Sequence, residues 1–345
     1  MPKLVVCKGL PGSGKSTWAE AELKRSGNTV RVNRDDLRLM LHHGLKWSGD
    51  REKLTVSAER AIVQAALLAH KNVIVDDTNL LGAGPARWEQ FAHDLNQLVP
   101  SKVTVEIKDF TDVPLSVCIE RDRYRTASRV GRGVIERMAL SAKLIDLSLY
   151  DKVAIVDIDG TLANLDHRLH YLEPNFDENG TGLPKDYYGF FRDVVKDAPF
   201  TVIFDAVRHL HLLGHTVIVL SGRPTTTGYD TSEWLESREF MTEGLPPLPY
   251  QHLFMRQGGD HRPDNQAKQD IMQMMFDAGL RKGAIKIIID DRDSVCDVWR
   301  GMDLPLVQVN RGVAIQVHPA ALVLAIEVGI PIVCAYDTDT EAQKA

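Results

Sequence analysis

Short apolar runs rich in β-branched residues recur along the chain, and most of them end in a polar loop. In the first half these runs are Leu4–Cys7, Thr29–Val32, Asn72–Val75 and Lys102–Ile107. In the second half they are Lys152–Val156, Thr216–Leu220 and Ala284–Ile289. Continuous apolar runs of this length are typical of parallel strands that are buried on both faces.

Longer stretches with helical patterning separate these runs. The predicted helices include Ser16–Arg25, Ala58–His70, Val134–Leu149 and Phe200–Leu213. Strands that alternate with helices predict an α/β protein with doubly wound parallel sheets, in which ligands bind beyond the carboxyl ends of the strands. We expect one domain over residues 1–150, a second over 151–320 and a C-terminal extension over 321–345.

Composition narrows the class of protein. The chain has 345 residues, of which 44% are hydrophobic and 26% charged, and no apolar run approaches the length of a membrane span. The first residues lack the layout of a secretory signal, which predicts a cytoplasmic protein with no membrane partner. The four cysteines form no C-x-x-C pair, so neither structural zinc nor a disulfide framework is expected.

Charge differs between the two halves. Residues 1–150 hold 23 basic and 18 acidic residues, whereas residues 151–345 hold 18 and 29. The net charges are therefore +5 and −11, which suggests domains with different partners. The positive half can attract a polyanion, although a dedicated nucleic-acid binder is usually more basic.

The first candidate site follows the first apolar run. Residues 9–16 read Gly-Leu-Pro-Gly-Ser-Gly-Lys-Ser, which matches the phosphate-binding loop G-x-x-x-x-G-K-[ST] between a strand and a helix. Backbone N–H groups of such a loop surround phosphates, Lys15 reaches the β and γ phosphates, and Ser16 ligates Mg²⁺. The predicted ATP-binding residues in this loop are Gly9, Gly12, Ser13, Gly14, Lys15, Ser16 and Thr17.

Acidic residues follow the next two strands. Asp35 can accept a proton from an attacking hydroxyl, and Arg38 lies three residues later on the same helical face, where it can hold a phosphate. Asp36 is better explained as an acid in the first helical turn. After the third strand, Asp76 or Asp77 can orient the metal or the lysine, and either can equally cap the segment that follows.

Residues 121–133 are dense in arginine. Arginine side chains suit phosphate oxygens, and a mobile arginine segment can close over a bound nucleotide. We therefore expect a lid here, in which Arg125 contacts the nucleotide and Arg129 is the rival candidate.

Three of these motifs are the glycine loop, the segment with Asp35 and Arg38, and the segment that begins with Asp76 and Asp77. In this order they resemble the kinase domain of the T4 phage type of polynucleotide kinase-phosphatase. The resemblance implies a P-loop, adenylate-kinase-like fold in which Asp35 activates a 5′-hydroxyl of DNA or RNA. It also implies that Arg38 is the partner arginine, Asp77 the third-strand acid and Arg125 the lid arginine.

The second candidate site begins at the end of the first strand of the second half. Residues 157–161 read Asp-Ile-Asp-Gly-Thr and fit D-x-D-G-T, so this half resembles the haloacid dehalogenase superfamily. Asp157 can attack phosphorus and form an aspartyl phosphate. Asp159 can then protonate the leaving alcohol and activate water, while Mg²⁺ neutralises the clustered negative charge.

Further motifs follow in the order of that superfamily. Ser221 supplies a hydroxyl for a phosphate oxygen, Lys268 bridges nucleophile and phosphate, and Asp290 and Asp291 supply carboxylates for Mg²⁺ together with Asp157 and Asp159. The resemblance to the phosphatase domain of the same polynucleotide family adds the site residues Arg168, Arg223 and Asp264. The segment Tyr171–Pro199 is longer than in the T4 type and is expected to form a cap over the site.

Together the motifs predict a bifunctional enzyme that heals nucleic-acid ends: a kinase for 5′-hydroxyls and a phosphatase for 3′-phosphates or 2′,3′-cyclic phosphates. Such ends suit a ligase partner, and the resemblance also implies self-association. One alternative is a small-molecule or nucleoside kinase fused to a small-phosphate phosphatase. A second is a non-catalytic nucleotide sensor, against which Lys15, Asp35, Asp157 and Asp159 argue. Trp47, Tyr124 and Tyr171 are the candidates for stacking on bases.

Overall fold

The computed structural model describes residues 1–43, 48–99, 102–125, 129–176, 181–237 and 247–333. The chain forms two compact units, Met1–Gly131 and Arg132–Ala345. Trp47 lies outside the described residues. Across the described ranges, every helix is too short or too polar to cross a membrane.

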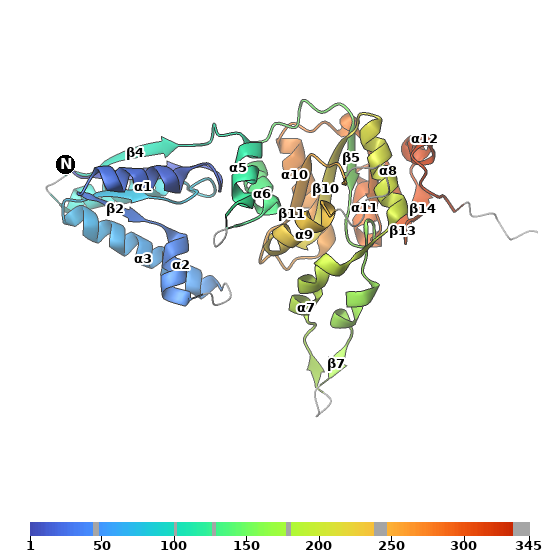
Figure 1. Cartoon of the computed structure of the whole chain (residues 1–345), viewed down its shortest axis with the longest axis horizontal. Coiled ribbons are helices and arrows are strands. Elements are labelled where there is room, and N and C mark those ends of the chain that lie inside the picture. The colour runs from blue at the N-terminus through green and yellow to red at the C-terminus, as the bar shows by residue number, and fades with distance from the viewer. Residues whose placement is uncertain (44–47, 100–101, 126–128, 177–180, 238–246, 334–345) are drawn as a thin grey trace, which may run out of the picture. The chain divides into compact units, whose positions relative to one another are not determined.

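The first unit, blue to cyan in Figure 1, is built on a four-stranded parallel sheet. Its strand order is β2-β3-β1-β4. Its elements are β1 (Lys3–Lys8), α1 (Lys15–Arg25), β2 (Thr29–Val32), α2 (Arg34–His42), α3 (Gly49–Leu68), β3 (Asn72–Val75), α4 (Ala86–Leu98), β4 (Thr104–Asp109) and α5 (Leu115–Arg123). All four predicted strands are present, and β2 and β3 have the predicted bounds.

Helices cover both faces of this sheet. On one face Val6 and Val75 pack with Val63 of α3 and with Trp88 of α4. On the other face Cys7 and Ile74 pack with Ala19 of α1. The central strands β1 and β3 are thus covered on both sides, as their continuous apolar runs predict, whereas the edge strand β4 is largely exposed.

The second unit is built on a six-stranded sheet with the order β11-β10-β5-β12-β13-β14. Its strands are β5 (Val153–Val156), β6 (Ala163–Asn164), β7 (Asn175–Phe176), β8 (Gly182–Leu183), β9 (Ala198–Pro199), β10 (Thr216–Pro224), β11 (His252–Arg256), β12 (Ile285–Asp290), β13 (Leu306–Asn310) and β14 (Val313–Val317). Its helices are α6 (Arg132–Ser141), η1 (Asp166–Leu172), α7 (Tyr187–Arg192), η2 (Asp193–Lys196), α8 (Thr201–Leu212), η3 (Thr225–Thr227), α9 (Gly228–Leu235), α10 (Asp264–Asp277), η5 (Lys282–Ala284), α11 (Asp293–Gly301) and α12 (Pro319–Glu327).

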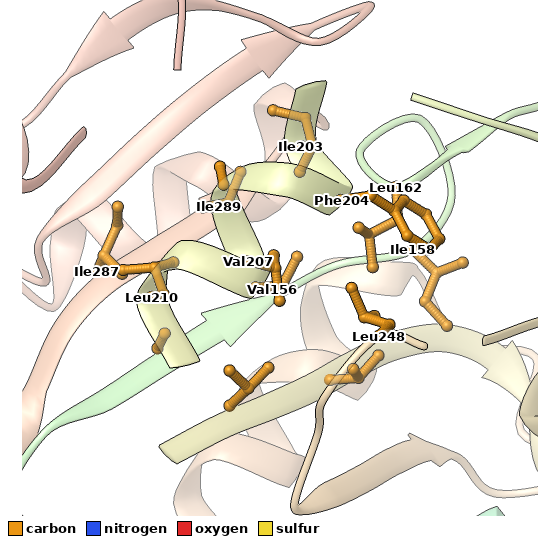
Figure 2. Packing of buried hydrophobic residues seen from close by; sticks show 14 of the residues in the cluster. Val156, Ile158, Leu162, Ile203, Phe204, Val207, Leu210, Leu248, Ile287 and Ile289 are labelled. Atoms are coloured by element: carbon orange, nitrogen blue, oxygen red, sulfur yellow. The ribbon is translucent and has the colours of Figure 1, made fainter. Parts of the chain in front are cut away.

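The main core of this unit lies between the sheet and α8. Figure 2 shows the inner face of α8, with Ile203, Val207 and Leu210, packed over Val156 of β5 and Ile289 of β12. Helix α12 adds to the same core, whereas α10 and α11 contact β10, β11 and β13 without joining it. The α/β class with parallel sheets is therefore confirmed for both units.

The edge of the second sheet differs from the prediction. Strands β11, β13 and β14 were not predicted, and β14 runs antiparallel to β13. The tight turn between them places Arg311 at φ 49° and Gly312 at φ 83°, which is the conformation of a two-residue hairpin. Such a turn leaves no room for a crossover helix, so the last strand reverses direction.

The C-terminal extension expected from residue 321 onward is part of the fold as far as residue 333. Ala321, Ala325 and Val328 are buried in the core of the second unit, because α12 contacts β12 and β13. Residues 334–345 lie outside the described part of the chain.

The predicted helix Val134–Leu149 begins earlier and ends at Ser141. Lys143 takes φ 55°, and its N–H and that of Leu144 donate to the carbonyls of Leu140 and Ala139, which closes the helix with a left-handed residue.

This helix, α6, packs within the second unit, although we expected it in the first domain. The carboxylate of Glu136 accepts the N–H of Leu253 at 2.6 Å on the edge strand β11. In the structure, the first compact unit ends at Gly131 and the second begins at Arg132. The domain boundary near residue 150 stays a prediction from sequence.

The described residues of the segment Tyr171–Pro199 contain several short elements, and we call this segment the cap. It contains the two-stranded β7–β8 sheet, α7, η2 and the short strand β9, which pairs with β6 beside the nucleophile loop. Figure 1 shows α7 and β7 extending from one end of the second sheet.

Candidate active sites

The glycine loop of the first unit connects β1 to the N-terminus of α1. Gly12 and Gly14 take φ values of 81° and 98°, which favour glycine. A Cβ at Gly12 would lie 2.3 Å from the carbonyl oxygen of Cys118 in α5. A Cβ at Gly9 would lie 2.8 Å from Oγ of Ser13. The backbone path of the loop therefore depends on glycine at these positions.

Lys15 is the buried cation of this loop. Its Nζ donates to the carbonyl of Leu10 at 2.7 Å and lies 3.4 Å from Oγ of Ser13. Burial lowers the pKa of Lys15, while the nearby carboxylate of Asp76 opposes the shift. Because its hydrogen-bond partners are neutral oxygens, the ammonium group of Lys15 can still pair with the negative oxygens of a phosphate. The next residues, Ser16 and Thr17, begin helix α1.

The two acids after β3 face different neighbours. Asp76 accepts from Nε of Arg31 at 2.7 Å, and its pKa is raised by burial although Arg31 and the hydroxyl of Ser16 lower it. Asp77 instead accepts from N and Nε of Arg34, both at 3.0 Å. The structure thus places Asp76 beside Lys15 and Ser16, and Asp77 beside Arg34.

Asp35 and Arg38 meet on α2, as their spacing predicts. Nη1 of Arg38 donates to Oδ1 of Asp35, whose side chain is 73% exposed. The guanidinium also forms a two-point pair with Glu52 of α3, with both distances 2.8 Å. The pair with Glu52 holds the guanidinium group of Arg38 in one orientation. The carboxylate of Asp35 is exposed to solvent. Asp36 accepts from Nη1 of Arg31.

The arginine segment lies near the glycine loop within the same unit. Nη1 of Arg121 approaches the carbonyl of Gly12 at 3.4 Å, and the charge of Arg125 lowers the pKa of Lys15. Asp122 is buried and accepts the N–H groups of Val130 and Gly131, which holds the end of the segment. Arg125 is therefore close to Lys15.

The second site lies at the carboxyl ends of β5, β10 and β12. The N–H of Asp157 donates to the carbonyl of Ile289 at 2.9 Å, so the nucleophile loop continues the sheet. Gly160 takes φ 86°, and a Cβ there would lie 2.0 Å from Oδ2 of Asp291. Glycine at this position allows the loops after β5 and β12 to approach each other.

Lys268 joins two of these loops. Its Nζ lies 2.7 Å from Oδ1 of Asp157 and 2.9 Å from Oδ2 of Asp290, and its side chain is 1% exposed. Burial and the neighbouring acids Asp290 and Asp291 raise the pKa of Asp157, and Lys268 opposes that shift. The structure therefore brings together Asp157, Lys268 and Asp290, which the sequence motifs place in one site.

The residues available for a divalent cation are Asp157, Asp290 and Asp291. Their ligand atoms lie within 4.8 Å of one another. Burial and Asp290 raise the pKa of Asp291 to about 6. Its Oδ1 is buried without a hydrogen-bond partner in the described part of the chain. Repelling carboxylates and an unused oxygen fit a hard cation such as Mg²⁺. The carboxylate of Asp159, predicted as a fourth ligand, pairs with arginines instead.

Asp159 lies in a buried network with two arginines. Its Oδ1 accepts from Nη2 of Arg168 at 2.7 Å and from Nε of Arg223 at 2.8 Å. Although burial opposes the shift, Arg223 and Arg168 lower the pKa of Asp159 to about 2. Both arginines also contact Asp197 of the cap. In this arrangement Asp159 is a carboxylate at neutral pH.

The segment Ser221–Arg223 lies at an irregularity in β10. The pairing of β10 with β11 shifts between Ser221 and Pro224, so Ser221, Gly222 and Arg223 lie within β10 instead of after it. Bulges of this kind redirect side chains. Ser221 is fully buried, and its Oγ accepts the N–H of Arg223 at 3.2 Å.

Asp264 begins α10 next to Lys268. It accepts from Nη2 of Arg256 at 2.7 Å and lies 3.5 Å from Nη1 of Arg292. A Cβ at Gly222 would lie 2.0 Å from Oδ1 of Asp264. Its pKa, which burial would raise, is lowered by Lys268 and Arg292, so Asp264 is a carboxylate that links three cations.

The sequence motifs did not identify three of the residues found in these networks. Glu52 lies on α3, Asp197 at the end of the cap and Arg292 directly after β12. The first two are single acids in acid-rich surroundings and carry no motif. For Arg292, its position directly after Asp290 and Asp291 was the available signal. Of the proposed stacking residues, Tyr124 is 82% exposed, and the hydroxyl of Tyr171 donates to Asp193.

Comparisons with known proteins divide the chain in a similar way. Residues 151–313 match the family described as the polynucleotide kinase PNKP phosphatase domain, and residues 4–145 match the family described as an AAA domain.

Individual proteins match either most of the chain or a smaller part of it. A protein of Autographa californica nuclear polyhedrosis virus, whose name assigns it polynucleotide kinase and RNA ligase activities, is 24% identical in an alignment of 335 residues that covers 88% of this chain. The chain spans 42% of the length of that relative. A chain of the Pnkp1/Rnl/Hen1 complex is 26% identical, with 90% of this chain and 96% of that chain covered and a TM-score of 0.37. The APS kinase CysC of Mycobacterium tuberculosis is 26% identical over 36% of this chain and 69% of its own, with a TM-score of 0.28.

Proposed function

We propose that this chain, in which an AAA-family domain precedes a domain of the PNKP phosphatase family, heals the ends of broken nucleic acids. It phosphorylates 5′-hydroxyl ends of DNA or RNA from ATP and removes phosphate from 3′ ends. The observation that carries the proposal is the presence on one chain of two separate clusters at strand ends: a glycine loop around buried Lys15, and Asp157 paired with buried Lys268.

In the kinase reaction, Asp35 accepts the proton of the 5′-hydroxyl while that oxygen forms a bond to the γ-phosphorus, and the bond to the ADP oxygen breaks. Lys15 moves from the carbonyl of Leu10 to the phosphates. Arg38, held by Glu52, orients the acceptor end, and Arg125 supplies positive charge from the lid side. Ser16 and Asp76 are the residues that would hold Mg²⁺, which screens the phosphate charge when bound.

In the phosphatase reaction, Oδ of Asp157 forms a bond to phosphorus as the bond to the 3′-oxygen breaks, and Asp159 gives that oxygen its proton. Asp159 then accepts a proton from the water that cleaves the aspartyl phosphate. Arg223 and Arg168 hold the pKa of Asp159 at about 2 in the structure. A bound phosphate offsets the charge of these arginines, and Asp159 then takes up from solvent the proton that it gives to the 3′-oxygen. Asp157, Asp290 and Asp291 would hold Mg²⁺, which offsets the charge of the incoming phosphate.

The two reactions cooperate because they act on opposite ends of a break. A 5′-phosphate and a 3′-hydroxyl are the ends that a ligase joins, so a nucleic-acid ligase is the expected consumer of the product. The positive charge of residues 1–150 supports a polyanionic substrate. A cytoplasmic location and self-association belong to the same proposal.

The decisive experiment uses one oligonucleotide with a 5′-hydroxyl and a 3′-phosphate, incubated with ATP and Mg²⁺ and followed by mass spectrometry. Lys15→Ala should abolish only the gain at the 5′ end, and Asp157→Asn only the loss at the 3′ end. The same assay at rising salt separates a polynucleotide from a small neutral alcohol, because only polynucleotide binding weakens steeply. No change at either end, with ATP consumed when nucleosides or small alcohols are added, refutes end healing.

A further inference from the structure

The cap contributes one carboxylate to the network of arginines in the phosphatase site. Asp197 lies between η2 and β9, and its side chain is completely buried. Its Oδ1 accepts from Nε of Arg168 at 2.7 Å, and its Oδ2 accepts from Nη2 of Arg168 at 2.8 Å. The same Oδ2 accepts from Nη2 of Arg223 at 2.5 Å. Asp197 thus binds both arginines that also bind Asp159.

The four side chains form a closed ring in which charges alternate. Arg168 and Arg223 are completely buried, and each donates to both Asp159 and Asp197. Two guanidinium groups out of water require two opposite charges. Asp159 supplies one negative charge and Asp197 supplies the other. Each arginine therefore divides its hydrogen bonds between two carboxylates.

The position of Asp197 is itself fixed by its surroundings. Its carbonyl accepts Nε1 of Trp234 at 2.8 Å, which ties this end of the cap to α9. The aromatic side chain of Phe190, also in the cap, packs on Arg168, with 4.1 Å between the Phe190 ring centroid and Cζ of Arg168. Nη1 of Arg223 is buried and has no hydrogen-bond partner within the described ranges, which leaves it available to a substrate oxygen.

We propose that Asp197 is a positioning residue of the phosphatase: by holding Arg168 and Arg223, it fixes the orientation of Asp159 toward the leaving oxygen. This inference rests on the proposed phosphatase function. Without the carboxylate of Asp197, both guanidinium groups have Asp159 as their only acidic partner in the ring. They are then expected to turn toward it and pull it out of line with the leaving oxygen.

The test compares leaving groups in single turnovers of Asp197→Asn and the wild type. The substrates are an oligonucleotide 3′-phosphate, a nucleoside 3′-monophosphate and p-nitrophenyl phosphate. An alcohol needs a proton from Asp159 to leave, whereas nitrophenolate does not. Since a positioned general acid contributes about 10²–10⁴-fold, we expect alcohol release to slow by about 10²-fold and nitrophenolate release by less than about 10-fold.

Asp193→Asn is the matched control. Asp193 lies four residues earlier in the cap, and its carboxylate pairs with Arg192, Lys196 and the hydroxyl of Tyr171 instead of the ring. We expect wild-type rates from it on all three substrates. The 5′-kinase activity of each sample, which Asp197→Asn should leave unchanged, reports the integrity of the first unit.

Equal losses on alcohol and nitrophenolate leaving groups, or no loss at all, overturn the positioning role. If Asp197→Asn does not fold, Asp197→Glu decides the question, because it keeps the charge and moves the carboxylate by one methylene. It should show a smaller selective loss, and an unchanged ratio of alcohol to nitrophenolate rates overturns the role. A wild type that cleaves both small phosphates but not the oligonucleotide refutes the polynucleotide substrate alone.

Discussion

Replacement of Lys268 by methionine tests the charge balance of the phosphatase site. Methionine keeps an unbranched side chain of similar length but has no charge. The substitution removes two buried contacts, at 2.7 Å to Asp157 and at 2.9 Å to Asp290. Three carboxylates whose ligand atoms lie within 4.8 Å of one another then have no lysine between them.

The expected cost follows from the loss of one partner of a buried ion pair. Such a loss typically destabilises a protein by about 3–5 kcal/mol, because the remaining charge is left without compensation. In a domain of this size, each kcal/mol shifts the melting temperature by about 2–4 °C, so we expect a decrease of about 6–20 °C.

Calorimetry in the presence of EDTA measures the melting of the second unit directly. Mg²⁺ should restore part of the lost stability in Lys268→Met, since a cation can take over the role of the ammonium group. Lys282→Met is the matched control: its side chain is 55% exposed and lies 4.0 Å from Asp303, so its loss should cost less than about 1 kcal/mol. A Lys268→Met protein that melts within about 2 °C of the wild type in EDTA would refute the reasoning.

Three further predictions concern both sites. Gly12→Ala places a Cβ against the carbonyl of Cys118 at a positive φ, so ATP binding should fall at least about tenfold while 3′-phosphatase activity is retained; normal ATP affinity in a nucleotide titration would contradict this. Glu52→Gln loosens the fork of Arg38 and should lower kcat for 5′ phosphorylation by about tenfold with little change in the KM for ATP; an effect on ATP alone would place the pair elsewhere. The pKa of Asp291 is raised to about 6, so its ligand oxygen protonates as the pH falls through 6, and the Mg²⁺ concentration for half-maximal phosphatase activity should rise up to about tenfold per pH unit below that value. An Mg²⁺ requirement that is independent of pH between 5 and 7.5 would exclude Asp291 as a ligand.

The strands and the motif positions were accessible from sequence because they depend on local patterns. The bounds of β2 and β3 match the apolar runs, and Lys15 and Asp157 follow strands as predicted. The end of α6 was not accessible, because it depends on one residue, Lys143, in a left-handed conformation. Strand β14 was not predicted, because Gln316 interrupts its apolar run and only one of its five residues, Ala314, is buried; its antiparallel pairing with β13 follows from the fold.

Ion-pair partners distant in the sequence could not be assigned without the fold. The choice of Asp76 over Asp77 as the neighbour of Lys15 depends on the direction in which each side chain leaves β3. The pairing of Arg38 with Glu52 depends on how α2 packs against α3. Sequence spacing has no information on either, because both follow from contacts between separate elements.

The sequence alone was enough to predict the chemistry that we propose for this protein. A glycine loop with Lys15 and Ser16, and two aspartates at the spacing of Asp157 and Asp159, are short segments whose function follows from neighbouring residues along the backbone. The tertiary structure decided the ionisation and the hydrogen-bond partners of these groups. Asp159 is a paired carboxylate because Arg168, Arg223 and the cap residue Asp197 converge on it from separate segments, and only folding brings such charges within hydrogen-bonding distance.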